Sequence, residues 1–247
     1  MVSIKTPEEI AIMAQAGRIL ARVIRELKAR VAPGLTTQEL DKLAEELILS
    51  YGAKPAFKGY GGFPNSLCTS LNEQIVHGVP SKRRLIEGDI LSLDSGVIYQ
   101  GFYSDMAVTV PIGSVSPEIL KLIQVTKKAL RKAISQVKSG KTIGDIAFAI
   151  QKHVESDGFQ VVRQLCGHGI GRQLHEKPDV LNFGQKHKGL ELKEGMVIAI
   201  EPMAVIGQPG IKKGPDGFCY QTADHSLSAH FEHTVAITEK GPRVLTE

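Results

Sequence analysis

The pattern of hydrophobic and polar positions predicts two helices followed by strands, and this order occurs twice along the chain. In the first part, apolar residues recur at helical spacing over about residues 10–31, directly after a cap, a proline and an acidic turn at Thr6-Pro7-Glu8-Glu9. A second helical pattern ends near Gly52. Apolar, β-rich runs then predict a strand at Leu67–Leu71 and a hairpin over residues 89–110.

The second part shows the same succession of elements. Helical spacing covers about residues 117–137 and 143–158, with Gly140 between the two segments. After a Gly/His-rich turn, strands are predicted at 196–200, 232–238 and 244–245. Segments 55–65 and 207–217 are rich in glycine and proline, which predicts irregular loops of the kind that often carry function.

The two parts form an internal sequence repeat. Val31-x-x-Gly34-x-Thr36-x-x-Glu39-Leu40 matches Val137-x-x-Gly140-x-Thr142-x-x-Asp145-Ile146 at an offset of 106 residues, and the strands ending at Asp94 and Glu201 match at an offset of 107. An acidic residue therefore ends an apolar strand at the same place in each part. Halves of about 1–112 and 113–247 that face each other would bring Asp94 and Glu201 to one central cleft.

Composition indicates an ordinary globular protein. Hydrophobic residues make up 42% and charged residues 23%, and the net charge of +4 is too small to indicate nucleic-acid binding, so no DNA partner is expected. The sequence has no apolar run that predicts a membrane span, and its N-terminus lacks a signal-peptide pattern. Three widely spaced cysteines without a C-x-x-C motif argue against disulfides and a cysteine zinc site. We therefore expect a cytoplasmic α/β protein, and the length of 247 residues allows one large domain or two small ones.

Two aspartates lie in the predicted hairpin, on either side of its tight turn. With an even-numbered loop at Tyr99-Gln-Gly-Phe102, Asp94 and Asp105 lie on adjacent strands and project from one face. Like charges this close destabilise a sheet unless something positive lies between them. Either these are one turn and one edge aspartate, or they bind a cation whose other ligands come from elsewhere in the chain.

Three further side chains complete a candidate metal site. Glu201 ends a buried strand in Ile198-Ala-Ile-Glu-Pro-Met203, Glu232 lies in a later strand, and glycines flank His168 in Cys166-Gly-His-Gly-Ile-Gly171. Four carboxylates among apolar strands are stable together only with cations. Carboxylates with one imidazole suit Mn²⁺, Fe²⁺ or Co²⁺, with Zn²⁺ as a further choice. Two such ions about 3.5–4 Å apart could share ligands and activate a bridging water for hydrolysis.

At this point the chain resembles the type I methionine aminopeptidases, in their minimal bacterial form, from residue 4 to residue 245. The motifs that carry the resemblance are Ser70-Leu-Asn-Glu-Gln-Ile-Val-His77-Gly, the Asp94/Asp105 pair, Gly167-His-Gly-Ile-Gly-Arg-x-x-His175-Glu, Ile200-Glu-Pro-Met203 and Ser226-Leu-Ser-Ala-x-Phe-Glu232-His-Thr. The resemblance implies the α+β pita-bread fold, in which two pseudo-symmetric halves form a central antiparallel sheet covered by helices, and a single catalytic domain over residues 1–247. It also implies removal of the N-terminal methionine from nascent polypeptides whose second residue is small.

The resemblance assigns a role to each ligand. It implies that Asp94 chelates one ion, that Asp105 and Glu232 bridge both ions, and that His168 and Glu201 complete the shell of the second ion. By the same resemblance Glu201 also moves a proton from the bridging water to the departing amine.

Two histidines outside the ligand set also receive roles from the resemblance. His175 would hydrogen-bond the scissile carbonyl and stabilise the oxyanion, and His77 would contact the substrate near the leaving side. The other histidines lack such a motif, and we interpret them as surface or packing residues. They are His153, His187, His225, His230 and His233.

A methionine pocket is implied by the same resemblance. Its residues would be Phe57, Tyr60, Phe63, Cys68 and Phe218. Sulfur–aromatic contacts of about 0.3–1.5 kcal/mol each would favour an unbranched thioether in such a slot. Phe57, Phe63 and Phe218 stand where many bacterial relatives have Cys, Tyr and Trp. All three are apolar, so we expect methionine selectivity to persist, whereas the detailed side-chain preference is left open.

Two further features each have a local and a functional interpretation. In the family, a serine at the position of Ser228 and carbonyls near Asn72 hold a monovalent cation, and the alternative is a local hydrogen bond of a strand-end serine. Clustered basic residues predict a solvated face, and the alternative is contact with ribosomal RNA. These residues are Lys127, Lys128, Arg131 and Lys132, with a second patch at Lys82-Arg83-Arg84.

Two other functions compete with removal of methionine. A proline-specific peptidase of the same fold (prolidase or Xaa-Pro aminopeptidase) usually carries a large extra N-terminal domain, whereas this chain begins almost at once with the catalytic half. A metal-free pita-bread module that binds RNA or protein would lack one or more ligands, and all five are present. We expect a monomer, and the sequence leaves the physiological metal open because affinity order and availability decide it.

Overall fold

The structure is a computed structural model that describes residues 2–247. The helices are α1 (Pro7–Arg30), α2 (Thr37–Ser50), α3 (Pro117–Ile134) and α4 (Ile143–Ser156), with one short 3₁₀ turn, η1 (Tyr60–Gly62). The strands of the largest sheet are β1 (Lys54–Pro55), β2 (Leu67–Leu71), β4 (Ile90–Tyr99), β5 (Phe102–Pro111), β7 (Cys166–Gly169), β8 (Glu176–Leu181), β9 (Val197–Ile200), β14 (Glu232–Thr238) and β15 (Gly241–Val244). Two smaller sheets contain β13 (Ser228–His230), β10 (Met203–Val205) and β6 (Gln160–Val161), and β11 (Ile211–Lys213), β12 (Tyr220–Thr222) and β3 (Gln74–Val76).

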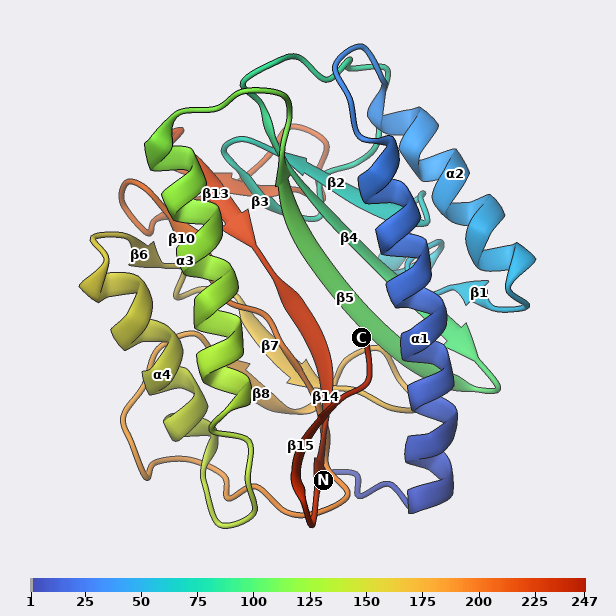
Figure 1. Cartoon of the computed structure of the whole chain (residues 1–247), viewed down its shortest axis with the longest axis vertical. Helices are drawn as coiled ribbons and strands as arrows, with labels where there is room; N and C mark the ends of the chain where they lie inside the picture. Colours follow the sequence, from blue (N-terminus) through green and yellow to red (C-terminus); the bar gives the residue numbers. More distant parts are fainter. Residues whose placement is uncertain (1) are drawn as a thin grey trace.

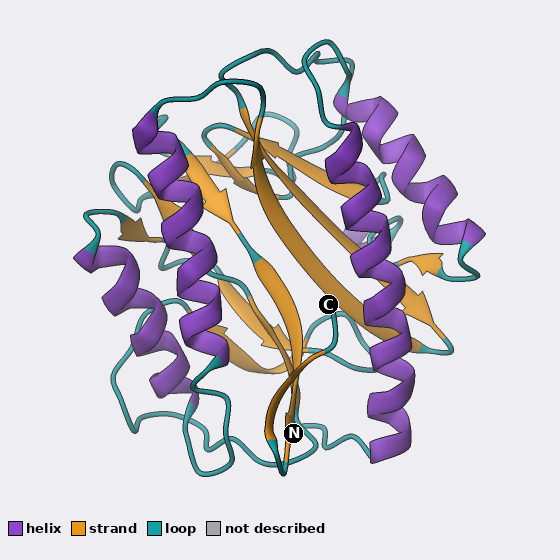
Figure 2. Ribbon diagram, in the orientation of Figure 1, coloured by secondary structure: helices purple, strands orange, loops and turns teal. Residues whose placement is uncertain are grey.

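The large sheet has nine strands, and all of its pairings are antiparallel. Its main path runs β1-β4-β5-β14-β9-β7-β8, with β2 paired to β4 and β15 paired to β14. The four helices lie in front of this curled sheet as two pairs, one pair at each side (Figures 1 and 2). Among residues 2–247 no helix is both long and apolar enough to cross a bilayer.

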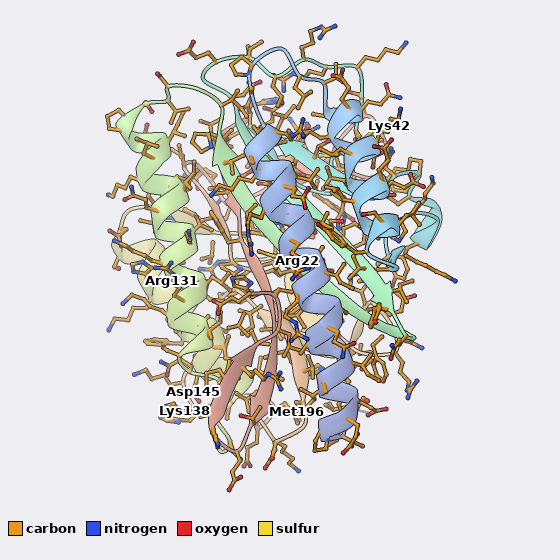
Figure 3. The ribbon with its side chains drawn as sticks, turned by 45° about the vertical axis from the view of Figure 1, so that its right-hand side comes forward. Arg22, Lys42, Arg131, Lys138, Asp145 and Met196 are labelled. Atoms are coloured by element: carbon orange, nitrogen blue, oxygen red, sulfur yellow. The ribbon has the colours of Figure 1, made fainter. Side chains whose placement is uncertain are left out.

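The second helices of the two pairs, α2 and α4, resemble each other in length and capping. Both α2 and α4 have 14 residues and begin with a capping box, in which Thr36 pairs with Glu39 and Thr142 pairs with Asp145. Figure 3 labels Asp145 at the start of α4. Each capping threonine also forms an isolated antiparallel bridge to the segment that leads into its own half's acid-bearing strand, at Arg84 and at Glu191.

Each helix pair packs on its own side of the sheet. Apolar residues of α1 and α2 form one buried cluster with β4, including Leu20, Leu40 and Leu93. A second cluster joins α3 and α4 to the strands of the other half, including Leu122 and Ile198. The apolar stripes of the helices contribute to both clusters. Because the residues of such a stripe recur at helical spacing, the sequence predicts the helices.

The predicted hairpin is confirmed, and its register places the two aspartates on one face. Gln100 and Gly101 form a two-residue loop with φ of 48° and 79°, as a tight hairpin turn requires. Asp94 pairs with Ala107, and Asp105 pairs with Gly96. The two carboxylates are therefore diagonal neighbours on adjacent strands rather than directly opposite one another.

Several short strands were not predicted. β7 lies in the Gly/His-rich segment that was interpreted as a turn, and its strand conformation comes from pairing with β8 and β9. A Cys-Gly-His-Gly segment has little β-propensity of its own, so only its neighbours in the sheet explain it. The helix predicted to extend to Val137 ends at Ile134, and the closing strand is Gly241–Val244.

Candidate active site

The five predicted ligands come from five separate segments and line one pocket of about 210 Å³. Asp94 lies in β4, Asp105 in β5, His168 in β7 and Glu232 in β14, while Glu201 directly follows β9. Met106 belongs to the cluster under α1 and α2, and successive residues of a strand face opposite sides, so Asp105 points away from the helices. The sheet therefore separates the helices from the pocket.

Three of these side chains already have the geometry of a metal site. Single ligand atoms of Asp105, His168 and Glu232 all lie within 4.8 Å of one another. The Nε2 atom of His168 is 3.9 Å from Oδ2 of Asp105 and 3.8 Å from Oε1 of Glu201. The Nδ1 atom of His168 lies 2.9 Å from the carbonyl oxygen of Gly169, which can only accept a hydrogen bond. The Nδ1–H tautomer follows, and it leaves the Nε2 lone pair facing the carboxylates.

The carboxylates are buried, and burial is the first cause of their perturbed pKa values. It raises the pKa of Asp94 to about 7, with His230 acting to lower it and the charge of Glu201 acting to raise it. Burial, and then the neighbouring charges of Asp94 and Glu201, raise the pKa of Asp105 well above its usual range. The pKa of Glu232 is raised in the same way, by burial and then by Asp105 and Glu201. The cluster thus resists ionisation without a positive partner.

Unpaired oxygens show that this cluster fits cations. Oδ1 of Asp94 and Oε1 of Glu232 are buried and have no hydrogen-bond partner anywhere in residues 2–247. Buried carboxylate oxygens are normally paired or coordinate metals. Oxygen and imidazole donors in this number suit borderline-hard divalent ions, so the residues fit the metal centre that the sequence predicted.

His175 and His77 lie in the same pocket. The Nδ1 atom of His175 is 2.7 Å from the hydroxyl of Tyr60, and its ring lies edge-on to that of His168 with centroids 4.4 Å apart. Burial, followed by His168, lowers the pKa of His175 to about 4. The pKa of His77 is also lowered, mainly by burial. Both rings are therefore neutral near pH 7, and a neutral imidazole can still donate one hydrogen bond.

The residues of the predicted methionine pocket lie in the same cavity. Its lining includes all five residues that the resemblance named, namely Phe57, Tyr60, Phe63, Cys68 and Phe218. Phe63 and Phe218 meet edge to face, with ring centroids 5.5 Å apart. Val76 and Leu174 line it as well and were not predicted. Their apolar character is common throughout the core, so no sequence signal distinguished them.

Sequence reasoning also missed a contact between His230 and the site residue Glu201. His230 was interpreted as a surface or packing residue; it is buried, as a packing residue would be, and its Nε2 atom lies 3.4 Å from Oε2 of Glu201. A signal was present, because His230 is only two residues before the predicted ligand Glu232 in the sequence. His230 is not among the residues that line the pocket, and neither are the other histidines without a motif, His153, His187, His225 and His233.

The remaining predicted features lie outside the pocket. Oγ of Ser228 lies 3.1 Å from the carbonyl oxygen of Asn72 and 2.9 Å from that of Gln74, as a hydroxyl that donates locally would. In the second basic patch, Arg83 contacts Asp89 and Arg84 donates to the carbonyl of Gly34. On α3, Lys127 and Arg131 instead line a groove together with Lys28 of α1, and Figure 3 labels Arg131 on its helix.

A curled antiparallel sheet with two helix pairs outside and a buried carboxylate–histidine cluster inside defines the pita-bread class of metallohydrolases. The chain belongs to metallopeptidase family M24, which it matches over residues 11–239. It is 47% identical to a methionine aminopeptidase of Clostridium acetobutylicum, over 100% of this chain and 99% of that protein. Among solved structures, the methionine aminopeptidase of Thermotoga maritima superimposes with a TM-score of 0.98 at 44% identity, covering 100% of both chains. The prolidase of Pyrococcus furiosus is more distant, with a TM-score of 0.81 at 27% identity, over 99% of this chain and 65% of that one.

Proposed function

We propose that this chain is a methionine aminopeptidase that removes the N-terminal methionine from polypeptides with a small second residue. The observation that carries the proposal is that the buried carboxylate–histidine cluster lines the same cavity as several aromatic side chains and the sulfur of Cys68. The pocket provides an apolar slot for one side chain, and the cluster provides hydrolytic chemistry beside it. The wide margin in identity between the methionine aminopeptidases and the prolidase favours this function over a proline-specific one.

In this proposal two divalent ions, drawn from Mn, Co, Fe or Zn, are held by the five ligands. Asp94 would be a ligand of one ion, Asp105 and Glu232 would be ligands shared by both, and His168 and Glu201 would complete the ligand set of the other ion. Bound there, the ions supply Lewis acidity that lowers the pKa of a water and polarises the scissile carbonyl.

The protein's own side chains would bind and orient the substrate. Phe57, Phe63 and Phe218 enclose the methionine side chain and exclude water from it. His175, neutral at pH 7 and held by Tyr60, donates a hydrogen bond from Nε2 to the carbonyl oxygen as negative charge develops there. The Glu201 carboxylate accepts the proton of the attacking water and delivers it to the departing amine. His77 contacts the substrate beyond the scissile bond.

The proposal extends to the domain organisation, the oligomeric state, the cellular location and a monovalent cation. We assign one catalytic domain, formed by halves of about 1–112 and 113–247, because equivalent helices and acid-bearing strands recur in both. A monomer acting in the cytoplasm on nascent chains, with the basic residues of α3 near the ribosome, is consistent with that substrate. A monovalent cation would be bound by the Ser228 hydroxyl oxygen and the carbonyl oxygens of Asn72 and Gln74, with the hydroxyl hydrogen turned away from it.

The test is a comparison of two peptides after removal and replacement of the metal. Chelated protein is reloaded singly with Mn²⁺, Co²⁺, Fe²⁺ or Zn²⁺ and assayed on Met-Ala-Ser and on an Ala-Pro peptide. We expect methionine release from Met-Ala-Ser that is lost on chelation and restored by at least one ion. Cleavage of Ala-Pro without cleavage of Met-Ala-Ser would overturn the proposed specificity.

A further inference from the structure

His230 is held rigidly behind the active site. It ends β13, where it pairs with Met203, and it is 1% exposed. The Oγ1 atom of Thr109 accepts a hydrogen bond from the backbone N–H of His230 and donates one to its carbonyl, both at 2.8 Å. His230 does not line the pocket itself. Its ring therefore meets the site from behind the ligands rather than from the substrate side.

The imidazole of His230 is buried without a hydrogen-bond partner among residues 2–247. Neither ring nitrogen has a hydrogen-bond partner within the described chain. Every protonation state of imidazole carries at least one N–H, and leaving such a donor buried and unpaired costs about 1–3 kcal/mol. The nearest carboxylate is Glu201, whose Oε2 atom is 3.4 Å from Nε2. A small adjustment of either side chain would convert this contact into a hydrogen bond.

The Glu201 carboxylate, in turn, lacks a hydrogen-bond donor in the described residues. In the described residues its carboxylate accepts no hydrogen bond, and the following residue, Pro202, has no N–H to offer. By contrast, Oδ1 of Asp105 accepts a hydrogen bond from the N–H of Met106 at 2.9 Å. The two oxygens of Glu201 face different imidazoles, because Oε1 lies 3.8 Å from His168 and Oε2 lies next to His230. A long side chain without such restraint would lose rotamer freedom when it binds an ion.

We propose that His230 is a positioning residue for Glu201, and this inference rests on the proposed metal centre. Its Nε2–H donates to Oε2, which fixes the carboxylate and leaves Oε1 for the ion beside His168. Partners of this kind behind a metal ligand typically change metal affinity or activity by about 10–100-fold. His230 would act only through Glu201, because it is not positioned to touch the substrate.

Substitutions at position 230 can distinguish a role as hydrogen-bond donor from a role in packing. His230→Met keeps an apolar side chain of similar length without a donor, while the amide nitrogen of His230→Gln reaches about as far as Nε2 and can still donate. His230→Asn also donates but is too short to reach Glu201. His153→Met is the matched control, because the Nε2 atom of His153 is also buried without a partner in the described residues, but on α4, outside the pocket.

The primary measurement is calorimetric titration of the chelated protein with Mn²⁺, without substrate. We expect His230→Met and His230→Asn to weaken one of the two binding steps about 10–100-fold, with His230→Gln within about threefold of the unmodified chain and His153→Met unchanged. In the peptide assay, His230→Met should lower kcat with KM nearly constant. If His230→Met does not fold, as judged by circular dichroism, the difference in Mn²⁺ affinity between His230→Gln and His230→Asn tests the inference.

Two results would overturn the inference. Unchanged Mn²⁺ affinity in both His230→Met and His230→Asn would show that Glu201 needs no partner at this position. An equal loss in His230→Gln would assign the residue to packing. Because the titration contains no peptide, it is independent of substrate: failure of the unmodified chain to release methionine would refute the proposed function without touching the role of His230.

Discussion

At the scale of single residues, the buried carboxyl of Asp94 makes stability depend on pH when no metal is bound. Burial raises its pKa to about 7, above the ordinary value of 3.8. A group with a raised folded-state pKa contributes stability that is present below the unfolded pKa and is lost as pH rises through the folded one. The metal-free chain should therefore lose unfolding free energy between about pH 4 and pH 7 from this group.

Asp94→Asn should remove this part of the pH dependence. In the presence of a chelator we expect the variant to exceed the unmodified chain in unfolding free energy by roughly 1–3 kcal/mol at pH 8, and to be close to it at pH 4. Urea unfolding at the two pH values measures the difference. Parallel pH profiles for the two proteins would show that the Asp94 carboxyl is not the source.

Asp105 and His175 should respond differently to truncation, because one would bridge ions and the other would contact only substrate. We expect Asp105→Ala to lose at least one bound ion and to abolish turnover, and Glu232→Ala to do the same. His175→Ala should retain full metal content and lower kcat about 10²–10³-fold, the usual effect of removing one oxyanion donor. Metal analysis of each purified variant measures this difference. Full metal content in Asp105→Ala would show that Asp105 is not a metal ligand.

Residue identities in the candidate site were predictable where a motif surrounds them. All five predicted ligands, both motif histidines and all five predicted pocket residues line one cavity. The contact of His230 with Glu201 was not predicted, because Glu201 is 29 positions away in the sequence and close only in the folded chain. Leu174 and Val76 escaped because apolar residues of this kind occur throughout the core.

At the scale of elements, Gly96 of β4 packs against Phe57 of the proposed methionine pocket. A Cβ atom on Gly96 would lie 2.8 Å from a ring carbon of Phe57 and 3.0 Å from Cβ of Ala56. Gly96→Ala should therefore displace Phe57 and raise KM for Met-Ala-Ser by about tenfold. Mn²⁺ affinity should be unchanged, since Phe57 is not a ligand.

Gly210→Ala is the control for this substitution, because its Cβ would approach only Ala223, at an ordinary 3.7 Å. Steady-state kinetics on the peptide, combined with calorimetry of Mn²⁺ binding, separates the pocket from the metal centre. A Gly96→Ala protein with unaltered KM would mean that β4 does not set the position of Phe57.

Elements with a strong local signal were predictable, and elements that depend on partners were not. The capping boxes and apolar stripes of α1, α2 and α4 are local in sequence, so their starts and faces could be predicted. The hairpin carried its own turn residues. The β7 strand and the two small sheets consist of segments of two to four residues, and tertiary pairing decides their conformation.

At the scale of the whole molecule, the first helix is locked to the end of the chain. A Cβ atom on Gly17 of α1 would collide with the backbone carbonyl of Leu245. In an isolated helix, Gly→Ala stabilises by roughly 1 kcal/mol. Here we expect Gly17→Ala to lower the unfolding free energy by about 2–3 kcal/mol, because two backbones would have to separate.

Denaturant unfolding of Gly17→Ala checks this prediction at constant metal concentration. A stability equal to or above that of the unmodified chain would show that α1 and the C-terminal segment are not closely packed in solution. The contact itself was not predictable from sequence, since glycine within a helical pattern gives no indication of which segment approaches it.

The central claim is that ligands from both halves of the repeat hold one pair of divalent ions. Anomalous diffraction from crystals of the Mn²⁺-loaded protein tests it most directly. The account predicts two anomalous peaks about 3.5–4 Å apart, enclosed by Asp94, Asp105, His168, Glu201 and Glu232. Peaks elsewhere on the molecule, or no peak among these five side chains, would contradict it.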